Sequence, residues 1–343
     1  MNILFCSVPF RPSIGGIETV SGLLAERFQC SGHRVVLVTQ SASDTPDECA
    51  YEVVRRPSAL RLCALVRWAD VVFHNNISLR FAWPQLFLRR PWVVAHHTWI
   101  AHRGLAARIK RLVIRRAQNI AVSQAIAADL GVRGVTIPNP YADNLFRRIE
   151  GLPRERELIF VGRLVSDKGL DVLIDALGLL AQRGRHLTLT VVGEGPERTT
   201  LQMRAKEAGI ADQIRFAGRL VGDPLVEQLN RHRILVVPSV WQEPFGVVAL
   251  EAMACGCVPL VAQSGGLPEA VGAAGRVVPQ GDHEALALAL DELVSEPGSL
   301  AIHLAAAPAQ LERHRQDRVA REYLQVITDV CRTHPATSPA RAA

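Results

Sequence analysis

The fold is decided by the stretch Glu243-Pro244-Phe245-Gly246-Val247-Val248-Ala249-Leu250-Glu251, which places two carboxylates eight positions apart. The apolar run after Gly246 predicts a helix that begins there. At about 1.5 Å rise per residue, Glu251 would lie roughly one to two turns into this helix, while Glu243 stays outside its N-terminus. The amides of Gly246, Val247 and Val248 would lack partners within the helix. Together with the helix dipole they form a site suited to a phosphate.

Two interpretations of these glutamates are open from their spacing alone. They are either an acid at a helix start and a residue on a solvated face, or acceptors for the hydroxyls of a ligand whose phosphate lies at the helix end. The surrounding Pro-Phe-Gly turn, the small-residue run 252–256 and the segment Ser264-Gly265-Gly266-Leu267-Pro268-Glu269 favour the second. With them, the stretch closely resembles the E-x7-E signature of the retaining glycosyltransferases of family 4, which have the GT-B fold.

Length and patterning predict an α/β chain with two domains. The chain has 343 residues, of which 48% are hydrophobic and 21% charged, a composition typical of well-packed proteins. Short β-rich runs alternate with helical patterns, which is typical of parallel sheets covered by helices. We expect two doubly wound, Rossmann-like domains that face each other across a cleft. The expected strands are 3–8, 34–39, 71–75, 92–96, 119–123 and 135–138 in the first half, and 158–162, 187–193, 214–217, 234–238, 258–262 and 276–278 in the second.

The domain boundaries follow from breaks in this pattern. Residues 139–153 contain Pro140, Gly151 and Pro153 without sustained periodicity and are interpreted as a linker. The predicted organisation is an acceptor-side domain over residues 1–145, a nucleotide-sugar-binding domain over 146–315, a C-terminal helix over 316–332 that packs back toward the N-terminal domain, and a flexible tail over 333–343.

The second half carries the expected donor site. Arg163 and Lys168 follow its first strand in one loop, and an arginine and a lysine that converge from one loop suit a diphosphate. By themselves, however, an arginine and a lysine at this spacing are more typical of a protein surface. The resemblance implies that they neutralise the pyrophosphate as ligand and as leaving group. It also implies that the base lies near Arg219 and Leu220, after the third strand of this half.

The first half offers a glycine pair and a histidine pair at strand ends. Gly15 and Gly16 follow the first strand, where they form either a plain turn or a close backbone approach to a ligand. His96 and His97 end the strand 92–96, and each is either structural or exposed to a cleft. The resemblance implies that the glycine loop faces the donor phosphates and that one histidine contacts the donor sugar. His97 is the first choice and His96 the second.

The function that the resemblance implies is transfer of a hexosyl or other glycosyl group, with retention at the anomeric carbon, from a UDP- or GDP-sugar to an acceptor hydroxyl. The leaving phosphate itself would assist the acceptor, so no prosthetic group and no metal are expected. The chain also contains no D-x-D, the metal-chelating motif of the other major glycosyltransferase fold. The expected catalytic residues are His97, Glu243, Arg163 and Lys168. The expected donor-binding residues are Gly15, Gly16, Arg163, Lys168, Arg219, Leu220, Glu243, Phe245, Gly246, Val247, Val248 and Glu251.

Two other functions stay open at this stage. One is a sugar-nucleotide 2-epimerase, an isomerase with the same two-lobed fold, which should carry additional acids in its cleft. The other is a non-catalytic partner protein that retains the GT-B fold and binds a nucleotide or a lipid surface. Release of nucleoside diphosphate from a nucleotide sugar, with and without acceptors, distinguishes these functions from glycosyl transfer.

The distribution of charge along the sequence bears on which surface the protein could contact. The net charge is +6, but nine Lys and Arg residues and no acid lie between Arg80 and Arg116. Arg108, Arg111 and Arg115 recur at helical spacing, with Leu105, Ile109 and Leu112 on another face. This basic amphipathic helix fits either an anionic membrane surface or a solvated outer face of a domain, whereas no nucleic-acid module accompanies it.

The same reasoning bears on the compartment. No apolar run is long enough to span a membrane, the N-terminus resembles a buried strand more than a secretory signal, and seven cysteines lie scattered without zinc-type spacing. We therefore expect a cytoplasmic protein, peripheral at the inner face of the membrane, that takes part in cell-surface glycan or glycolipid assembly with a glycan or lipid-linked acceptor.

Overall fold

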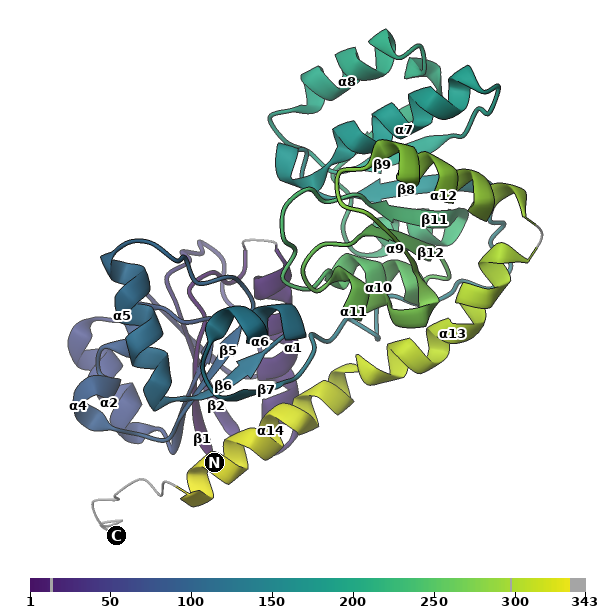
Figure 1. The fold of residues 1–343 in the computed structure, drawn as a ribbon. Coiled ribbons are helices and arrows are strands. Elements are labelled where there is room, and N and C mark those ends of the chain that lie inside the picture. Colours follow the sequence, from purple (N-terminus) through teal and green to yellow (C-terminus); the bar gives the residue numbers. More distant parts are fainter. Residues whose placement is uncertain (13–14, 297, 334–343) are drawn as a thin grey trace. The chain divides into compact units, whose positions relative to one another are not determined.

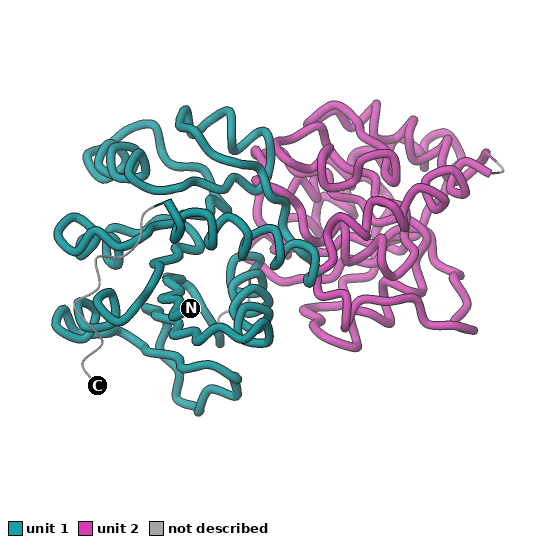
Figure 2. The backbone as a smooth tube through the Cα atoms, turned by 90° about the horizontal axis from the view of Figure 1, so that it is seen from below, with its two compact units in different colours: residues 1–140, 316–343 teal, residues 141–315 magenta. Residues whose placement is uncertain are grey.

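The chain divides into two compact units, which Figure 2 distinguishes by colour: residues 1–140 together with 316–343, and residues 141–315. The computed structural model describes residues 1–12, 15–296 and 298–333. Of the predicted tail over 333–343, only Thr333 belongs to the described residues. Within the described part of the chain, no helix has both the length and the apolar character needed to cross a membrane.

The first unit is built on a seven-stranded parallel sheet with the strand order β3-β2-β1-β4-β5-β6-β7. Val, Ile, Leu and Phe dominate its central strands because both faces of a parallel sheet are covered. The elements are β1 (Asn2–Cys6), α1 (Gly16–Cys30), β2 (Arg34–Thr39), β3 (Glu52–Arg55), α2 (Ala59–Trp68), β4 (Val71–Asn75), α3 (Leu79–Ala82), α4 (Gln85–Leu88), β5 (Trp92–His96), α5 (Leu105–Val113), the 3₁₀ turn η1 (Ile114–Arg116), β6 (Gln118–Ala121), α6 (Gln124–Leu130), β7 (Gly134–Thr136) and α14 (Gln316–Thr333).

The last helix, α14, belongs to the first unit through its packing. It lies with α1 against one face of the sheet, whereas α2, α4 and α5 lie toward the other (Figure 1). Phe5, Phe28 and Phe73 form an aromatic cluster, and Tyr323 of α14 meets Phe73 edge to face with 5.8 Å between ring centroids. Such pairs contribute beyond their buried area. Residues from both ends of the chain therefore share one core.

The second unit has a six-stranded parallel sheet with the order β10-β9-β8-β11-β12-β13. Figure 1 shows α7, α8 and α12 on one face and α9, α10 and α11 on the other. The elements are β8 (Arg156–Val161), η2 (Ser166–Lys168), α7 (Leu170–Gln182), β9 (Leu189–Val192), α8 (Arg198–Glu207), η3 (Ala211–Gln213), β10 (Ile214–Gly218), α9 (Asp223–Arg231), β11 (His232–Val237), α10 (Val247–Ala254), β12 (Val258–Ala262), α11 (Leu267–Val271), η4 (Gly272–Ala274), β13 (Arg276–Val278), α12 (His283–Ser295) and α13 (Ser299–Arg313).

Each sheet has one place where the direction of strand addition reverses, and such switch points are where doubly wound folds bind ligands. In the first unit the reversal lies between β1 and β4, and in the second between β8 and β11. The loops that leave β1, β8 and β11 at their carboxyl ends carry the glycine pair, Lys168 and Glu243, whereas His97 follows the neighbouring strand β5.

Every predicted strand overlaps an observed one, and the sequence analysis missed only β3 among the described strands. This four-residue strand pairs with β2 alone and has no fully buried residue. Its two valines are flanked by Glu52 and Arg55, so it lacks the apolar run that identifies a covered strand. The prediction of an α/β chain with two Rossmann-like sheets is confirmed.

Candidate active site

The site in the second unit centres on an ion pair between two predicted residues, Lys168 from the loop after β8 and Glu243 from the loop after β11. Lys168 Nζ lies 2.5 Å from Glu243 Oε1, and the hydroxyl of Ser239 donates to the same oxygen at 2.8 Å. Glu243 is only 8% exposed. Both bonds engage Oε1, whereas no described residue bonds to Oε2. One carboxylate oxygen thus fixes the side chain and the other is available to a ligand.

A glycine brings the lysine to this position. Gly169 follows Lys168 with φ +67°, and a Cβ at this residue would come within 2.0 Å of the Pro238 carbonyl oxygen at the end of β11. The amide of Val240 also donates to the Asp167 carbonyl at 3.1 Å. Only glycine allows this backbone conformation and this close approach together. The turn after β8 is therefore held directly against the loop after β11, across the switch point.

The Ser264-Gly265-Gly266 segment supports Glu243 from its main chain. The Gly266 amide donates to the Glu243 carbonyl at 2.8 Å, and the Glu243 amide donates to Ser264 Oγ at 3.2 Å. Gly265 has φ +53°, and a Cβ there would lie 1.9 Å from the Glu243 carbonyl oxygen. The sequence segment that strengthened the family resemblance is thus the backbone support of the first glutamate.

Helix α10 begins at Val247, as the sequence predicted, with Gly246 as N-cap at φ +108°. The Ala249 amide bonds to the Gly246 carbonyl at 3.0 Å, so the amides of Gly246, Val247 and Val248 precede the first helical bond and have no partner within the helix. Phe245 is 2% exposed and packs against His314 with ring centroids 5.4 Å apart. Its side chain therefore serves packing, which leaves only its main chain for a ligand.

Glu251 lies in the second turn of α10, and no described residue forms an ion pair or hydrogen bond with its carboxylate. Loss of water around the carboxyl raises its pKa to about 7, although part of the side chain stays accessible. A carboxylate in such surroundings gains from hydroxyl donors that a ligand brings. The ribose role that the resemblance implies for Glu251 is consistent with this environment.

Three glycine-containing loops lie side by side at the carboxyl ends of β8, β9 and β10. A Cβ at Gly193 would lie 1.8 Å from the Gly162 carbonyl oxygen, and one at Gly195 would lie 2.2 Å from the Leu164 carbonyl oxygen. The Gly193 amide donates to the Gly218 carbonyl at 2.8 Å. Arg163 leaves the first of these loops exposed, and its guanidinium has no bonded partner among the described residues. Arg219 is exposed beyond the third loop, and Leu220 is partly exposed.

The site of the first unit is a chain of buried polar groups at its own switch point. His97 donates through Nε2 to Asn75 Oδ1 at 2.6 Å, and Asn75 Nδ2 donates to Ser21 Oγ at 2.7 Å. Ser21 in turn bonds to Ser7 Oγ at 2.8 Å. Burial lowers the pKa of His97 to about 3, which a hydrogen bond with Asn139 opposes. His97 is therefore neutral and its orientation is fixed by β4 and α1.

His96 has a different environment. Its Nε2 lies 2.9 Å from Asn119 Oδ1 on the neighbouring strand β6, the side chain is fully buried, and burial lowers its pKa to about 4. Gly15 is the N-cap of α1, and the carboxylate of Glu18 folds over it, because a Cβ on Gly15 would meet Glu18 Oε2 at 2.6 Å. Ser13 and Ile14 of this loop lie outside the described residues.

The predicted basic helix needs one correction. Arg111 does not belong to a free basic face, because it pairs with Asp129 at 3.1 Å and donates to the carbonyls of Ile100 and Asp129. The helix itself, α5, ends at Val113, and Arg115 lies in η1. The periodic pattern could not distinguish an arginine that anchors the helix from one that faces solvent.

Sequence reasoning also missed the polar residues that hold the predicted ones. Ser239 fixes Glu243, and Ser21 and Asn75 fix His97. The signal for two of them is position in the sequence: Asn75 ends β4 and Ser239 is the second residue after β11, at the two switch points. A polar residue at such a strand end deserves the same consideration as the motif residues.

Comparison with known proteins agrees with this geometry. Residues 143–309 match the family model described as Glycosyl transferases group 1. Over 177 residues the chain is 38% identical to the D-inositol 3-phosphate glycosyltransferase of Rhodococcus jostii, which covers 49% of this chain and 39% of the relative. Over 169 residues it is 36% identical to the GDP-mannose-dependent alpha-(1-6)-phosphatidylinositol monomannoside mannosyltransferase of Mycolicibacterium smegmatis, which covers 47% of this chain and 44% of the relative.

A comparison with solved structures covers nearly the whole chain. The crystal structure of Anabaena HepE in complex with UDP and glucose matches 96% of this chain and 100% of that chain with a TM-score of 0.79 at 22% identity. The likeness to HepE shows the fold of the chain, whereas the sequence matches span less than half the length of the two curated relatives. Residues 143–309, just under half of the chain, match the Glycosyl transferases group 1 family, which is the family of the retaining family 4 enzymes of GT-B fold.

Proposed function

We propose that this protein is a retaining glycosyltransferase that moves a sugar from a nucleoside-diphosphate sugar to an acceptor hydroxyl. The observation that carries the proposal is the ion pair of Lys168 with Glu243, which lies at the switch point of the second unit with one carboxylate oxygen free of described partners. The matched family supports the reaction type.

The proposed mechanism is electrostatic. Arg163 and Lys168 stabilise the charge that grows on the departing diphosphate, and the amides at the start of α10 add to this stabilisation. Glu243 Oε2 accepts hydrogen bonds from hydroxyls of the transferred sugar, and Glu251 accepts them from the ribose. His97 contacts the sugar from the first unit in its neutral form. No covalent nucleophile is required, because the leaving phosphate removes the proton of the acceptor hydroxyl.

For the donor we propose a UDP- or GDP-sugar. HepE has been solved with UDP and glucose, and the mycobacterial relative is described as GDP-mannose-dependent. Arg219 and Leu220 would lie near the base. Since Arg219 is exposed, main-chain groups of this loop would contribute most of the contacts to the base.

For the acceptor we propose a glycan or lipid-linked molecule at the inner face of a membrane, in the assembly of cell-surface glycans or glycolipids. The mycobacterial relative is named for a phosphatidylinositol mannoside acceptor. In the present chain, α5 exposes Arg108 together with Leu105 and Leu112, which are 75% and 63% exposed. Cationic and apolar groups on one exposed helix suit an anionic leaflet.

The test is to incubate the purified protein with UDP- and GDP-sugars and to measure nucleoside diphosphate and glycosylated product. The parent protein should release diphosphate with retention at the anomeric carbon, whereas Glu243→Gln and Lys168→Met should not. Lys206→Ala, which removes an exposed lysine of α8, is the matched control. Formation of an epimerised sugar without an acceptor would point to the isomerase instead, and binding without turnover of any donor would point to a non-catalytic partner.

A further inference from the structure

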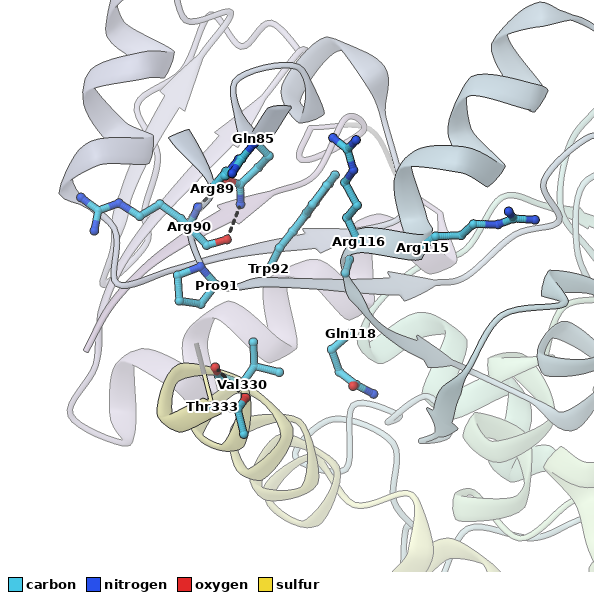
Figure 3. A pocket seen from close by; sticks show the side chains of 11 residues that line it. Gln85, Arg89, Arg90, Pro91, Trp92, Arg115, Arg116, Gln118, Val330 and Thr333 are labelled. Atoms are coloured by element: carbon cyan, nitrogen blue, oxygen red, sulfur yellow. Dashed lines mark hydrogen bonds between the residues drawn. The ribbon is translucent and has the colours of Figure 1, made fainter. Parts of the chain in front are cut away.

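The first unit contains a cavity that lies away from the candidate sugar site. It has a volume of about 600 Å³ and opens beside Trp92 at the start of β5 and Gln118 near the start of β6, with Val330 and Thr333 of α14 on another side (Figure 3). His97, in contrast, follows the last residue of β5. Since the strands are parallel, the cavity and His97 lie at opposite edges of the same sheet, and the cavity has no part in the proposed transfer reaction.

Four arginines lie in and around this cavity. Arg89 and Arg90 contribute from the end of α4, and Arg115 and Arg116 from η1, whereas no Asp or Glu lines it. None of these four arginines forms an ion pair within the described part of the chain. The sequence 71–128 contains no acidic residue, so the whole segment that contributes the arginines lacks internal counter-charge. Such a cluster attracts a multiply charged anion.

The backbone around the arginines is fixed, so the cavity is part of the fold. The buried Gln85 accepts from the Arg90 amide through Oε1 at 3.0 Å and donates from Nε2 to the Arg90 carbonyl at 3.4 Å. Arg89 has a left-handed backbone with φ +47°, which this pair of bonds holds. In Figure 3, Arg116 extends along the indole of Trp92, while Arg90 and Arg115 point outward from the two rims. The Arg90 guanidinium donates to the Arg67 carbonyl, so its charge is held at the rim.

Trp92 forms a fixed wall of the cavity. Its side chain is 5% exposed, and the indole packs against the buried ring of His74 with 5.5 Å between the ring centroids. The indole nitrogen Nε1 is fully buried, so a ligand in the cavity does not reach it. A phosphate that enters the cavity would therefore bind through the arginines.

The neighbouring helices indicate what carries the phosphate. Phe87 of α4 is 77% exposed and lies two residues before Arg89, and Leu112 of α5 is 63% exposed and lies three residues before Arg115. A soluble phosphate ester would leave these apolar groups in water, whereas a lipid leaflet accepts them next to the anionic headgroup. We propose that this arginine cavity binds the phosphate of an anionic lipid headgroup while Phe87 and Leu112 insert beside it.

The experiment measures binding of the full chain to vesicles, independently of any transfer activity. The vesicles contain phosphatidylcholine alone, or equal parts of phosphatidylcholine and phosphatidylglycerol. The parent should sediment with the second kind only. Arg89→Ala/Arg116→Ala should weaken this binding by about 30-fold, since each basic residue near the surface contributes about 1 kcal/mol. The double variant Arg318→Ala/Arg321→Ala removes the same charge from the exposed side of α14 and should bind within about threefold of the parent.

Two further measurements identify the source of the phosphate and the role of the apolar groups. The variant Phe87→Ser/Leu112→Ser keeps every charge. It should reduce binding to the mixed vesicles more at high salt than at low salt, because salt screens the attraction between charges but not the insertion of apolar groups.

Equal losses of binding in the two arginine double variants would overturn the cavity as the site and would leave only a general attraction between the protein's positive charge and the anionic vesicle. A different outcome is that inorganic phosphate raises the melting temperature of the parent but not of Arg89→Ala/Arg116→Ala, while the parent fails to bind vesicles. That combination would overturn the lipid assignment in favour of a soluble phosphate ester. Circular dichroism melts confirm that each variant is folded.

Discussion

Lys168 Nζ and Glu243 Oε1 lie 2.5 Å apart although 75 positions separate them in the chain. The pair is shared between two functions, because the ammonium that neutralises Glu243 is also the group that the proposed mechanism assigns to the diphosphate. Ser239, on the same oxygen, keeps Glu243 in place when the lysine turns to a ligand.

Replacement of Lys168 by Met should lower kcat by about a hundredfold to a thousandfold, the usual effect of removing one preorganised group that stabilises charge in the transition state. Lys206→Ala should leave kcat unchanged. The measurement is nucleoside diphosphate release at saturating donor. A loss that appears only in KM would mean that Lys168 binds the ground state and transition state equally.

The double variant Lys168→Met/Glu243→Gln should be less impaired than the product of the single effects predicts. The two groups are in contact, and removing either one already leaves the other without its partner. Steady-state kinetics on the four proteins of the cycle give the coupling energy. Strict additivity would show that the two side chains act independently on the donor.

Gly265→Ala should reduce kcat by about 10²-fold, because the new Cβ would meet the Glu243 carbonyl and displace the catalytic carboxylate by a fraction of an ångström or more. Gly281→Ala is the matched control. Gly281 also has a positive φ, +74°, but a Cβ there meets nothing within 4 Å. It should cost about 1–2 kcal/mol of unfolding free energy through backbone strain alone. Similar kcat values for both variants would exclude a positioning role for Gly265.

The raised pKa of Glu251 predicts that donor affinity and the stability of the folded protein change in opposite directions with pH. Donor affinity should fall as the pH falls through about 7, because the protonated carboxyl is a poorer hydroxyl acceptor than the carboxylate. The neutral His97, with a pKa of about 3, does not titrate in this range. The folded protein retains a proton that the unfolded chain loses near the ordinary glutamate pKa of 4.5. The contribution of this group to the free energy of unfolding is therefore complete below pH 4.5 and is lost as the pH rises through about 7.

Glu251→Gln should abolish both trends. The checks are KM for the donor and the urea midpoint, each measured between pH 5.5 and 8.5. A parent protein whose donor KM is flat across this interval would contradict the assignment of Glu251 to the ribose.

Tyr323 offers a test of the shared core of the first unit. Its hydroxyl is buried and has no hydrogen-bond partner among the described residues, so Tyr323→Phe should keep or raise the unfolding free energy, by up to about 1 kcal/mol. Tyr323→Ala removes the ring that packs on Phe73 and should cost about 3–5 kcal/mol. Urea denaturation measures both. A clear loss of stability in the Phe variant would reveal a buried water on the hydroxyl.

The predicted donor-site residues of the second unit could be identified from the sequence because they belong to motifs of residues that are close together in the chain. The start of α10 near Gly246 and the loops after β8 and β10 follow from turn residues and strand ends within short windows. In contrast, the pattern of α5 suggested three equivalent arginines, and the packing of Arg111 against Asp129 from another helix made one of them an anchor. The helical spacing of residues in a sequence indicates which side chains share a face of the helix, but not which residues of other elements that face contacts.

By itself, the sequence determined the two parallel sheets, the strand ends at which ligands bind, and the family signature, because apolar runs and glycines act on neighbouring residues. Only the tertiary structure decided which side chains meet. Gly169 against Pro238 brings Lys168 to Glu243, and Asn75 and Ser21 orient His97. These contacts join separate loops at a switch point, and their geometry depends on how strands far apart in the chain pair. The arginine cavity likewise exists only because the ends of α4, η1 and α14 meet at one sheet edge.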